Sequence, residues 1–338
     1  MKIMRSVVAA AMAAGVLAVV VSSSRAQPLS LKMASTLPAE HSSTKAMETV
    51  FKAELARRSH NTIDVELAPG EQLGSGSDIV QKLRADSIFA IWIGVGFFAR
   101  LVPEIEAVNL PFVFKNYDDA MRTIAGPVGK LIEARLDAKG FTTLAWMELG
   151  ARNVTNAKRP LKTLGDFRDL KIRVQPSETF MATFRALGAV PRVINTTDIH
   201  MALQQGDIDA LDITYSLVQG LRYYEEQKYV SDTNHMLDLV VLVANKQAFM
   251  ELTPQQREMI RGAARVTALQ QRRMADAGEA AALTELKAKG LQFDPLPSET
   301  RIAFRKATAG VIDGVRKRIG AELVDRVIAE ADRNRKPR

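Results

Sequence analysis

The alternation of strand-like and helix-like segments in the first third of the chain constrains its fold more than any other feature. Three β-leaning runs, at 29–33, 63–67 and 88–93, are separated by amphipathic segments at 43–58 and 77–87. The third run, IFAIWI, is apolar throughout, which is typical of a strand covered on both faces. Because strands joined by helices usually run parallel, this pattern predicts an α/β fold with a largely parallel sheet.

The second half of the chain repeats this scheme. A strand pattern at 141–149 is followed by LKIRV at 170–174, a helix that ends at Gly188, and the short strand IDALDI. Without its first 26 residues the chain has about 312 residues, which is more than one small domain needs. We therefore expect two α/β lobes of similar plan with a hinged cleft between them.

One helix is predicted to be much longer than the others. Thr253 and Pro254 suit the N-cap and first positions of a helix, and the helical pattern continues to Lys289, before Gly290. A helix of about 36 residues would be roughly 54 Å long, enough to cross both lobes. The apolar positions lack a sustained heptad, which favours a helix that spans the lobes over a coiled-coil partner.

The N-terminus is typical of an export signal. Lys2 and Arg5 precede an apolar run at 7–21, and a small-x-small site ends at Ala26. The run is shorter than a membrane-spanning helix, and no cysteine stands at the cleavage point for lipid attachment. We expect cleavage after Ala26, a mature chain that begins at Gln27, and a periplasmic location. A retained membrane anchor is the alternative.

Composition excludes several functions. The chain has no cysteine, so thiolate metal sites and cysteine nucleophiles are excluded, and its four histidines are scattered rather than clustered as in a zinc site. The formal net charge of +8 falls to +5 without the first 26 residues, the basic residues are dispersed, and aromatic residues make up 6%. No nucleic-acid groove is expected. The chain also lacks the GxSxG and HExxH motifs of hydrolases. We expect no enzyme activity, no metal and no cofactor.

A glycine-rich turn follows the third strand. Gly94, Gly96 and Ala99 fit the GxGxxA pattern of dinucleotide-binding folds. That pattern normally opens the first βαβ unit and is followed by an acidic residue about 20 positions later, and neither condition holds here. We interpret the turn as a tight loop whose backbone amides line a cleft.

Two arginines are candidates for anion binding. In LKIRV the apolar residues alternate with Lys171 and Arg173, so Arg173 should face away from them. Arg152 follows the break at Gly150, which ends the strand before it. Side by side in a cleft, the two guanidinium groups would bind a carboxylate in its own plane. The spacing alone favours the alternative, in which both are exposed arginines at strand ends.

In order along the chain, a series of segments resembles the DctP-type solute-binding proteins of tripartite ATP-independent periplasmic (TRAP) transporters. These segments are LKMASTLPAEHSS, APGEQLG, VPEIEAVNLPFVFKNYDDA, GAR at 150–152, LKIRV, ALGAVP, MALQQGDIDALD and VSDTNH. The resemblance implies a protein that captures an organic acid and delivers it to TRAP membrane subunits. Coupling to another transporter or to a sensor is the alternative, with a secreted hydrolase a more distant one. A monomer is the default expectation.

The resemblance also implies a fold. It is the two-lobe, type II-like periplasmic binding protein, with hinge strands and a long helix that spans the lobes. We expect the first lobe to comprise 27–149 and about 238–277, and the second lobe to comprise 150–237 and about 278–338.

The resemblance implies roles for individual residues. Arg173 corresponds to the family's carboxylate-binding arginine, and Arg152 to a second arginine of the site. Asp212 could bind a ligand hydroxyl or amine, or hold an arginine in place. It is followed by Ile213, where the family often has asparagine. Further candidates lie on loops that should face the cleft, and these are Glu148, Trp92, Gly94 and Thr36. For Trp92, a buried aromatic residue of the core is the favoured alternative.

Overall fold

The computed structural model describes residues 28–334. The predicted signal peptide and its cleavage site lie outside the described residues. Within them, no helix has the length and apolar character that crossing a membrane requires.

A single mixed sheet runs through the molecule, in the order β2-β1-β3-β8-β4-β7-β5-β6, with β9 also pairing with β8. Its strands are β1 (Leu29–Ala34), β2 (Ile63–Ala68), β3 (Ala90–Gly94), β4 (Phe141–Asn156), β5 (Lys171–Val174), β6 (Val190–Val193), β7 (Ala210–Ile213), β8 (Tyr229–Asn245) and β9 (Gln292–Pro295).

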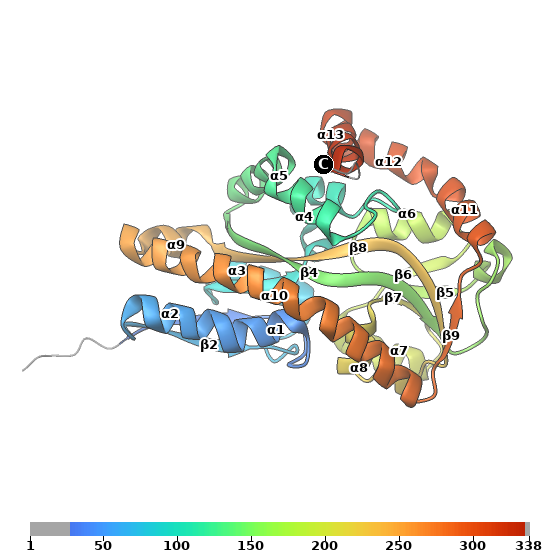
Figure 1. Ribbon diagram of the computed structural model, residues 1–338, viewed down its shortest axis with the longest axis horizontal. Coiled ribbons are helices and arrows are strands. Elements are labelled where there is room, and N and C mark those ends of the chain that lie inside the picture. Colours follow the sequence, from blue (N-terminus) through green and yellow to red (C-terminus); the bar gives the residue numbers. More distant parts are fainter. Residues whose placement is uncertain (1–27, 335–338) are drawn as a thin grey trace, which may run out of the picture.

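The helices are distributed around this sheet, and Figure 1 shows α10 crossing the whole molecule diagonally. They are α1 (Ser42–Ala46), α2 (Lys52–Ser59), α3 (Gly76–Arg84), α4 (Tyr117–Ala125), α5 (Pro127–Ala138), α6 (Glu178–Ala186), α7 (Ile199–Gln204), α8 (Tyr215–Gly220), α9 (Lys246–Glu251), α10 (Pro254–Ala288), α11 (Ser298–Ala307), α12 (Ala309–Ile319) and α13 (Ala321–Asn334).

The sheet is parallel in its outer parts and antiparallel in its centre. β1 pairs in parallel with β2 and β3, and β5 with β6 and β7, as the strand-helix alternation predicted. In the centre, the long strands β4 and β8 pair with each other and with β7 and β3 in antiparallel fashion. We call the part built on β1–β3 the first lobe and the part built on β5–β7 the second lobe. β4 and β8 pass through both (Figure 1).

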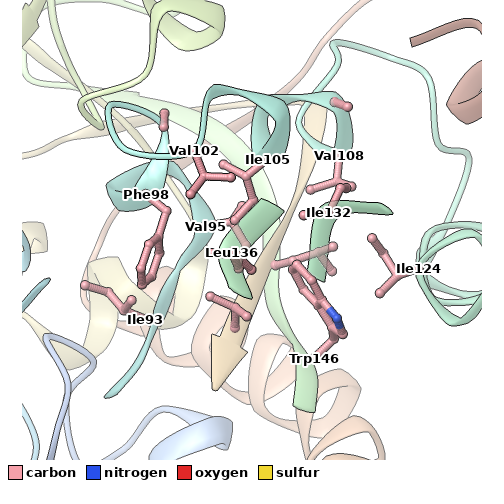
Figure 2. Packing of buried hydrophobic residues seen from close by; sticks show 14 of the residues in the cluster. Ile93, Val95, Phe98, Val102, Ile105, Val108, Ile124, Ile132, Leu136 and Trp146 are labelled. Atoms are coloured by element: carbon pink, nitrogen blue, oxygen red, sulfur yellow. The ribbon is translucent and has the colours of Figure 1, made fainter. Parts of the chain in front are cut away.

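Each lobe has its own apolar core. One core of the first lobe packs β3 and the turn after it against α5 and β4, and Figure 2 shows Phe98 of this turn in the same cluster as Leu136 and Trp146. A second core covers the other face of the lobe, beneath α2 and the first half of α10. The second lobe has separate cores around α6 and around α7 and α8.

The C-terminal helices correct the expected lobe boundaries. The sequence placed everything from about 278 to 338 in the second lobe. Phe304 of α11 does pack in a second-lobe core. However, Val311 and Val315 of α12 and Val324 and Val327 of α13 lie in the first-lobe core with α4 and α5. The chain returns to the first lobe because apolar faces of α12 and α13 cover a surface that α4 and α5 leave exposed.

The long helix has the predicted ends. Thr253 and Gln256 form a capping box at its start, and α10 then runs for 35 residues, or roughly 52 Å. Ala263 and Ala264 pack in a first-lobe core, whereas Leu286 packs in a second-lobe core. The helix therefore spans both lobes (Figure 1).

We predict that Phe98→Ala destabilises the protein by about 3–5 kcal/mol. Phe98 is fully buried and meets Phe141 edge-to-face at 5.2 Å between ring centroids, so truncation leaves a cavity. Urea denaturation would measure the loss. The control Leu269→Ala removes a side chain that is 68% exposed and should change stability by less than about 0.5 kcal/mol. Equal effects of the two substitutions would contradict the packing described here.

Candidate functional site

Arg173 is a buried cation that forms no ion pair with another described residue, although Glu71 and Asp212 are near enough to favour its charge. Its neighbours Ile172 and Val174 face the core of the second lobe, so Arg173 lies on the opposite face of β5, where it is 4% exposed. Its Nε donates to the carbonyl of Ile194 at 3.1 Å, and its buried Nη2 has no hydrogen-bond partner among the described residues. Burial lowers the pKa of the guanidinium to about 10. A group in this state favours an anion beside it.

Arg152 is in the opposite situation, because two carboxylates surround it. Its Nε lies 2.8 Å from Asp212 Oδ1, its Nη1 lies 2.6 Å from Asp238 Oδ2, and its Nη2 donates to the carbonyl of Asp212. The side chain is 1% exposed and also stacks over the ring of Phe180. Burial disfavours the charge, but the two carboxylates outweigh it and raise the pKa of Arg152. Its charge is compensated within the protein.

The carboxylates beside Arg152 join three strands. Asp212 of β7 also lies 3.1 Å from His235 Nε2, and although burial opposes its charge, Arg152 and His235 together lower the pKa of Asp212. Asp238 of β8 accepts from Asn109 and from Gln175 Nε2, the latter at 2.9 Å. Burial raises the pKa of Asp238. Arg152, Asp212 and Asp238 form a cluster, the arginine cluster, that holds β4, β7 and β8 together.

A cavity lies between the lobes, with Arg173 in its wall. Its lining comes from loops of the first lobe, from β4 and from the second lobe, and comprises Thr36, Leu37, Gly94, Phe97, Leu149, Arg152, Arg173, Gln175, Thr196, Ile213, Leu217 and Leu221. The cavity is small. The volume accessible to the centres of water molecules is about 20 Å³, which is room for about one or two waters. An organic acid can enter only if the lobes part or the lining side chains move.

The structure brings some of the predicted site residues together and separates others. Thr36, Gly94, Arg152 and Arg173 line the cavity. Asp212 does not line the cavity and forms an ion pair with Arg152 instead. This geometry favours the role of holding an arginine in place over that of binding a ligand hydroxyl or amine.

Two predicted site residues lie elsewhere. Trp92 is fully buried in the first-lobe core, and its Nε1 donates to Thr44 at 3.3 Å. Side chains alternate along β3, so Trp92 turns toward this core. Glu148 lines two hollows along α10 and forms an ion pair with Arg272 of that helix at 3.2 Å. Neither residue lines the cavity at Arg173.

Gln175 is a cavity residue that the sequence analysis missed. It is two positions beyond Arg173 and therefore shares its face of the chain, a relation that the period-2 pattern could have revealed. A Cβ atom at Gly96 would lie 2.3 Å from Gln175 Oε1, so a larger residue at position 96 would force the Gln175 amide to move. The glycine-rich turn thus has a structural use that is unrelated to nucleotide binding.

A second group of acidic residues lies along α10. Glu279 Oε1 accepts from the backbone N–H of Ser216 at 3.2 Å, which links α10 to the start of α8. Burial raises the pKa of Glu279 to about 7. Burial, with repulsion from Asp276, also raises the pKa of Glu148 to about 7. Within residues 28–334, no group of three or more acidic or histidine side chains could hold a metal ion.

We predict that Arg152→Met destabilises the protein by about 3–5 kcal/mol, because Asp212 and Asp238 would remain buried without their cation. Urea denaturation of the unliganded protein would measure this. Arg168→Ala, at an exposed position of the second lobe, is the control and should cost less than about 0.5 kcal/mol. A loss below about 1 kcal/mol for Arg152→Met would contradict the structural role of the arginine cluster.

We also predict that Glu279→Gln alters the pH dependence of stability. A carboxyl whose folded pKa is about 7 binds protons more strongly folded than unfolded, so its stabilising contribution is complete below its unfolded pKa and is lost as the pH rises toward 7. Relative to the variant, the wild type should therefore lose stability between about pH 5 and about pH 8.

Urea midpoints at the two pH values would measure this difference. Glu299→Gln, at an exposed position, should leave the pH dependence unchanged. If Glu279→Gln also leaves it unchanged, the protonation of Glu279 makes no contribution.

Comparisons with known proteins place this site in context. The sequence model of the bacterial extracellular solute-binding protein family 7, DctP, matches residues 33–318. The C4-dicarboxylate-binding periplasmic protein DctP of Rhodobacter capsulatus is 30% identical over 279 residues, which cover 82% of this chain and 84% of that protein.

Two solved structures are similar in both fold and sequence. The sugar acid binding protein DctPAm from Advenella mimigardefordensis, in complex with galactonate, has a TM-score of 0.88 and 27% identity, covering 91% of this chain and 99% of its own. A TRAP periplasmic solute binding protein from Ochrobactrum anthropi has a TM-score of 0.81 and 31% identity, covering 91% of this chain and 96% of its own.

Proposed function

The chain belongs to family 7 of the bacterial extracellular solute-binding proteins, and on that premise we propose that it captures an organic acid in the cavity between its lobes. The observation that carries this proposal is Arg173, a buried guanidinium with an unpartnered Nη2 in the wall of the cavity. The carboxylate of the ligand supplies the missing counter-charge. Arg152 also lines the cavity, but Asp212 and Asp238 already compensate its charge.

The chemistry of an arginine suits this task. A guanidinium presents two N–H groups in one plane to the two oxygens of a carboxylate. With a pKa of about 10, Arg173 remains charged at neutral pH, so recognition needs no proton transfer. A charge-assisted contact of this kind contributes about 1.5–3 kcal/mol.

Binding and closure are coupled through the hinge. Residues of the cavity come from both lobes, and β4 and β8 are the strands that connect them. A ligand that contacts both lobes binds the closed conformation more tightly than the open one and shifts the population toward it. The cavity is too small for an organic acid to enter without opening, in agreement with this cycle.

The protein works in the periplasm, as its family does. We propose that the chain is cleaved after Ala26 and acts as a monomer, without turnover of its ligand and without nucleic acid. Its partner is the membrane part of a TRAP transporter, the system named for the similar protein of Ochrobactrum anthropi. Co-purification with the membrane subunits would distinguish this partner from another transporter or a sensor.

We predict that a carboxylic acid stabilises the wild type against heat and that Arg173→Ala abolishes the effect. Protein beginning at Gln27, refolded from denaturant to remove bound ligand, would be heated with monocarboxylates, dicarboxylates, sugar acids and neutral sugars. A ligand at 100 times its Kd adds about 2.7 kcal/mol of stability. Arg168→Ala removes the same charge at an exposed position and should retain the shift.

Two results would overturn the proposal. Stabilisation by neutral sugars alone would mean that the cavity does not select a carboxylate. Stabilisation by an acid that persists in Arg173→Ala would place the carboxylate elsewhere.

A further inference from the structure

We propose that the ligand is a small 2-hydroxy monocarboxylic acid with an apolar body, and that Gln175 recognises its hydroxyl group. This inference rests on the proposed function and specifies the chemistry of the same cavity. Three observations carry it: the apolar lining, the compensated charge of Arg152, and the orientation of the Gln175 amide.

The lining of the cavity is mainly apolar. Six of its side chains are hydrocarbon, contributed by both lobes and by β4, and these are Leu37, Phe97, Leu149, Ile213, Leu217 and Leu221. Apart from the arginines and Gln175, the polar side chains in the lining are the threonines Thr36 and Thr196. A sugar acid would bury several hydroxyl groups against hydrocarbon, and each buried hydroxyl without a partner lowers affinity by about tenfold.

The site provides for one carboxylate rather than two. Arg173 is the cation with an unpartnered nitrogen, whereas Arg152 is held by Asp212 and Asp238 at 2.8 and 2.6 Å. A second ligand carboxylate would have to compete with two buried aspartates for Arg152. The arrangement therefore selects against dicarboxylic acids.

Gln175 presents a hydrogen-bond acceptor to the ligand. Its Nε2 donates to Asp238 Oδ2 at 2.9 Å, and the same oxygen accepts from Arg152 Nη1 at 2.6 Å, so this oxygen acts as an acceptor. The amide orientation is therefore fixed. Gln175 Oε1 packs against the turn of Gly94, which lines the cavity, and Gly96, and it is buried without a hydrogen-bond partner among the described residues.

The acceptor is well placed to contact the atom next to the carboxylate. Arg173 and Gln175 are two positions apart, so their side chains leave the same face of the chain about 7 Å apart at the backbone. A hydroxyl on the carbon next to the carboxylate can donate to Oε1. An oxo group there would place acceptor against acceptor, and an ammonium group would lie beside the like charge of the Arg173 guanidinium.

The experiment is a titration of refolded wild type, followed by calorimetry, with compounds that differ at one position. The probes are 2-hydroxy-4-methylpentanoate, 2-oxo-4-methylpentanoate, 4-methylpentanoate and leucine, with galactonate and succinate as polar acids. We expect the hydroxy acid to bind about tenfold more tightly than the oxo and unsubstituted acids. It should bind at least about 100-fold more tightly than galactonate.

Two variants make the assignment specific. Gln175→Leu should reduce the preference for the hydroxy acid over 4-methylpentanoate from about tenfold to about onefold, while Gln205→Leu, at an exposed position, should preserve it. Ile213→Asn should shift the preference toward galactonate. If Gln175→Leu does not fold, the ratio of hydroxy to oxo acid in the wild type still decides the role of Gln175.

The outcomes separate this inference from the proposed function. Binding of galactonate or succinate that depends on Arg173 and is tighter than that of the hydroxy acid would overturn the inference and leave carboxylate capture intact. Equal affinity for the hydroxy and oxo acids would overturn the role of Gln175. If no acid binds, or Arg173→Ala binds acids as the wild type does, the proposed function fails together with the inference.

Discussion

The ion pairs of Arg152 with Asp212 and Asp238 are the interaction on which the rest of the site depends. They join β4, β7 and β8, where the two lobes meet, and they occupy both aspartates that could otherwise compensate a second arginine. Arg173, by contrast, is buried and forms no ion pair within residues 28–334, and its Nη2 has no hydrogen-bond partner there. The protein thus contains one arginine that serves the structure and one that is available to a ligand, although both are buried to a similar degree.

The hinge has the features that relative movement of two lobes requires. β4 and β8 are antiparallel neighbours, and their register shifts between Glu148 and Gly150 and again between Arg152 and Val154. Gly150 has a φ of +140°, and a Cβ there would lie 2.8 Å from the side chain of Thr214 in the second lobe. These irregularities weaken the ladder near the cavity, so bending can concentrate there while the cores of the lobes stay intact.

The sequence predicted local features better than long-range pairings. The capping residues of α10, the parallel outer strands and the burial pattern around Arg173 all follow from neighbours in the chain. The pairing of Arg152 could not be predicted, because Asp212 and Asp238 lie 60 and 86 positions away.

The direction of the Trp92 side chain also depends on long-range packing, because it is set by which face of β3 the first-lobe helices cover. The same limit applies to α12 and α13, whose amphipathic faces do not indicate which lobe they join. Gln175 could have been predicted from the sequence. It directly follows LKIRV and is two positions after Arg173, so side-chain alternation places it on the same face.

The buried charge of Arg173 also gives a physical reason for ligand-dependent closure. Burial lowers the pKa of its guanidinium to about 10, so its surroundings disfavour the charged form. Apolar side chains from both lobes meet in the cavity and favour closure, whereas burial of this charge opposes it. A carboxylate bound beside the guanidinium, as proposed, would reduce this opposing contribution. On the proposed function, the residue that binds the ligand therefore also makes closure more favourable with ligand than without it, and the apolar wall supplies attraction between the lobes.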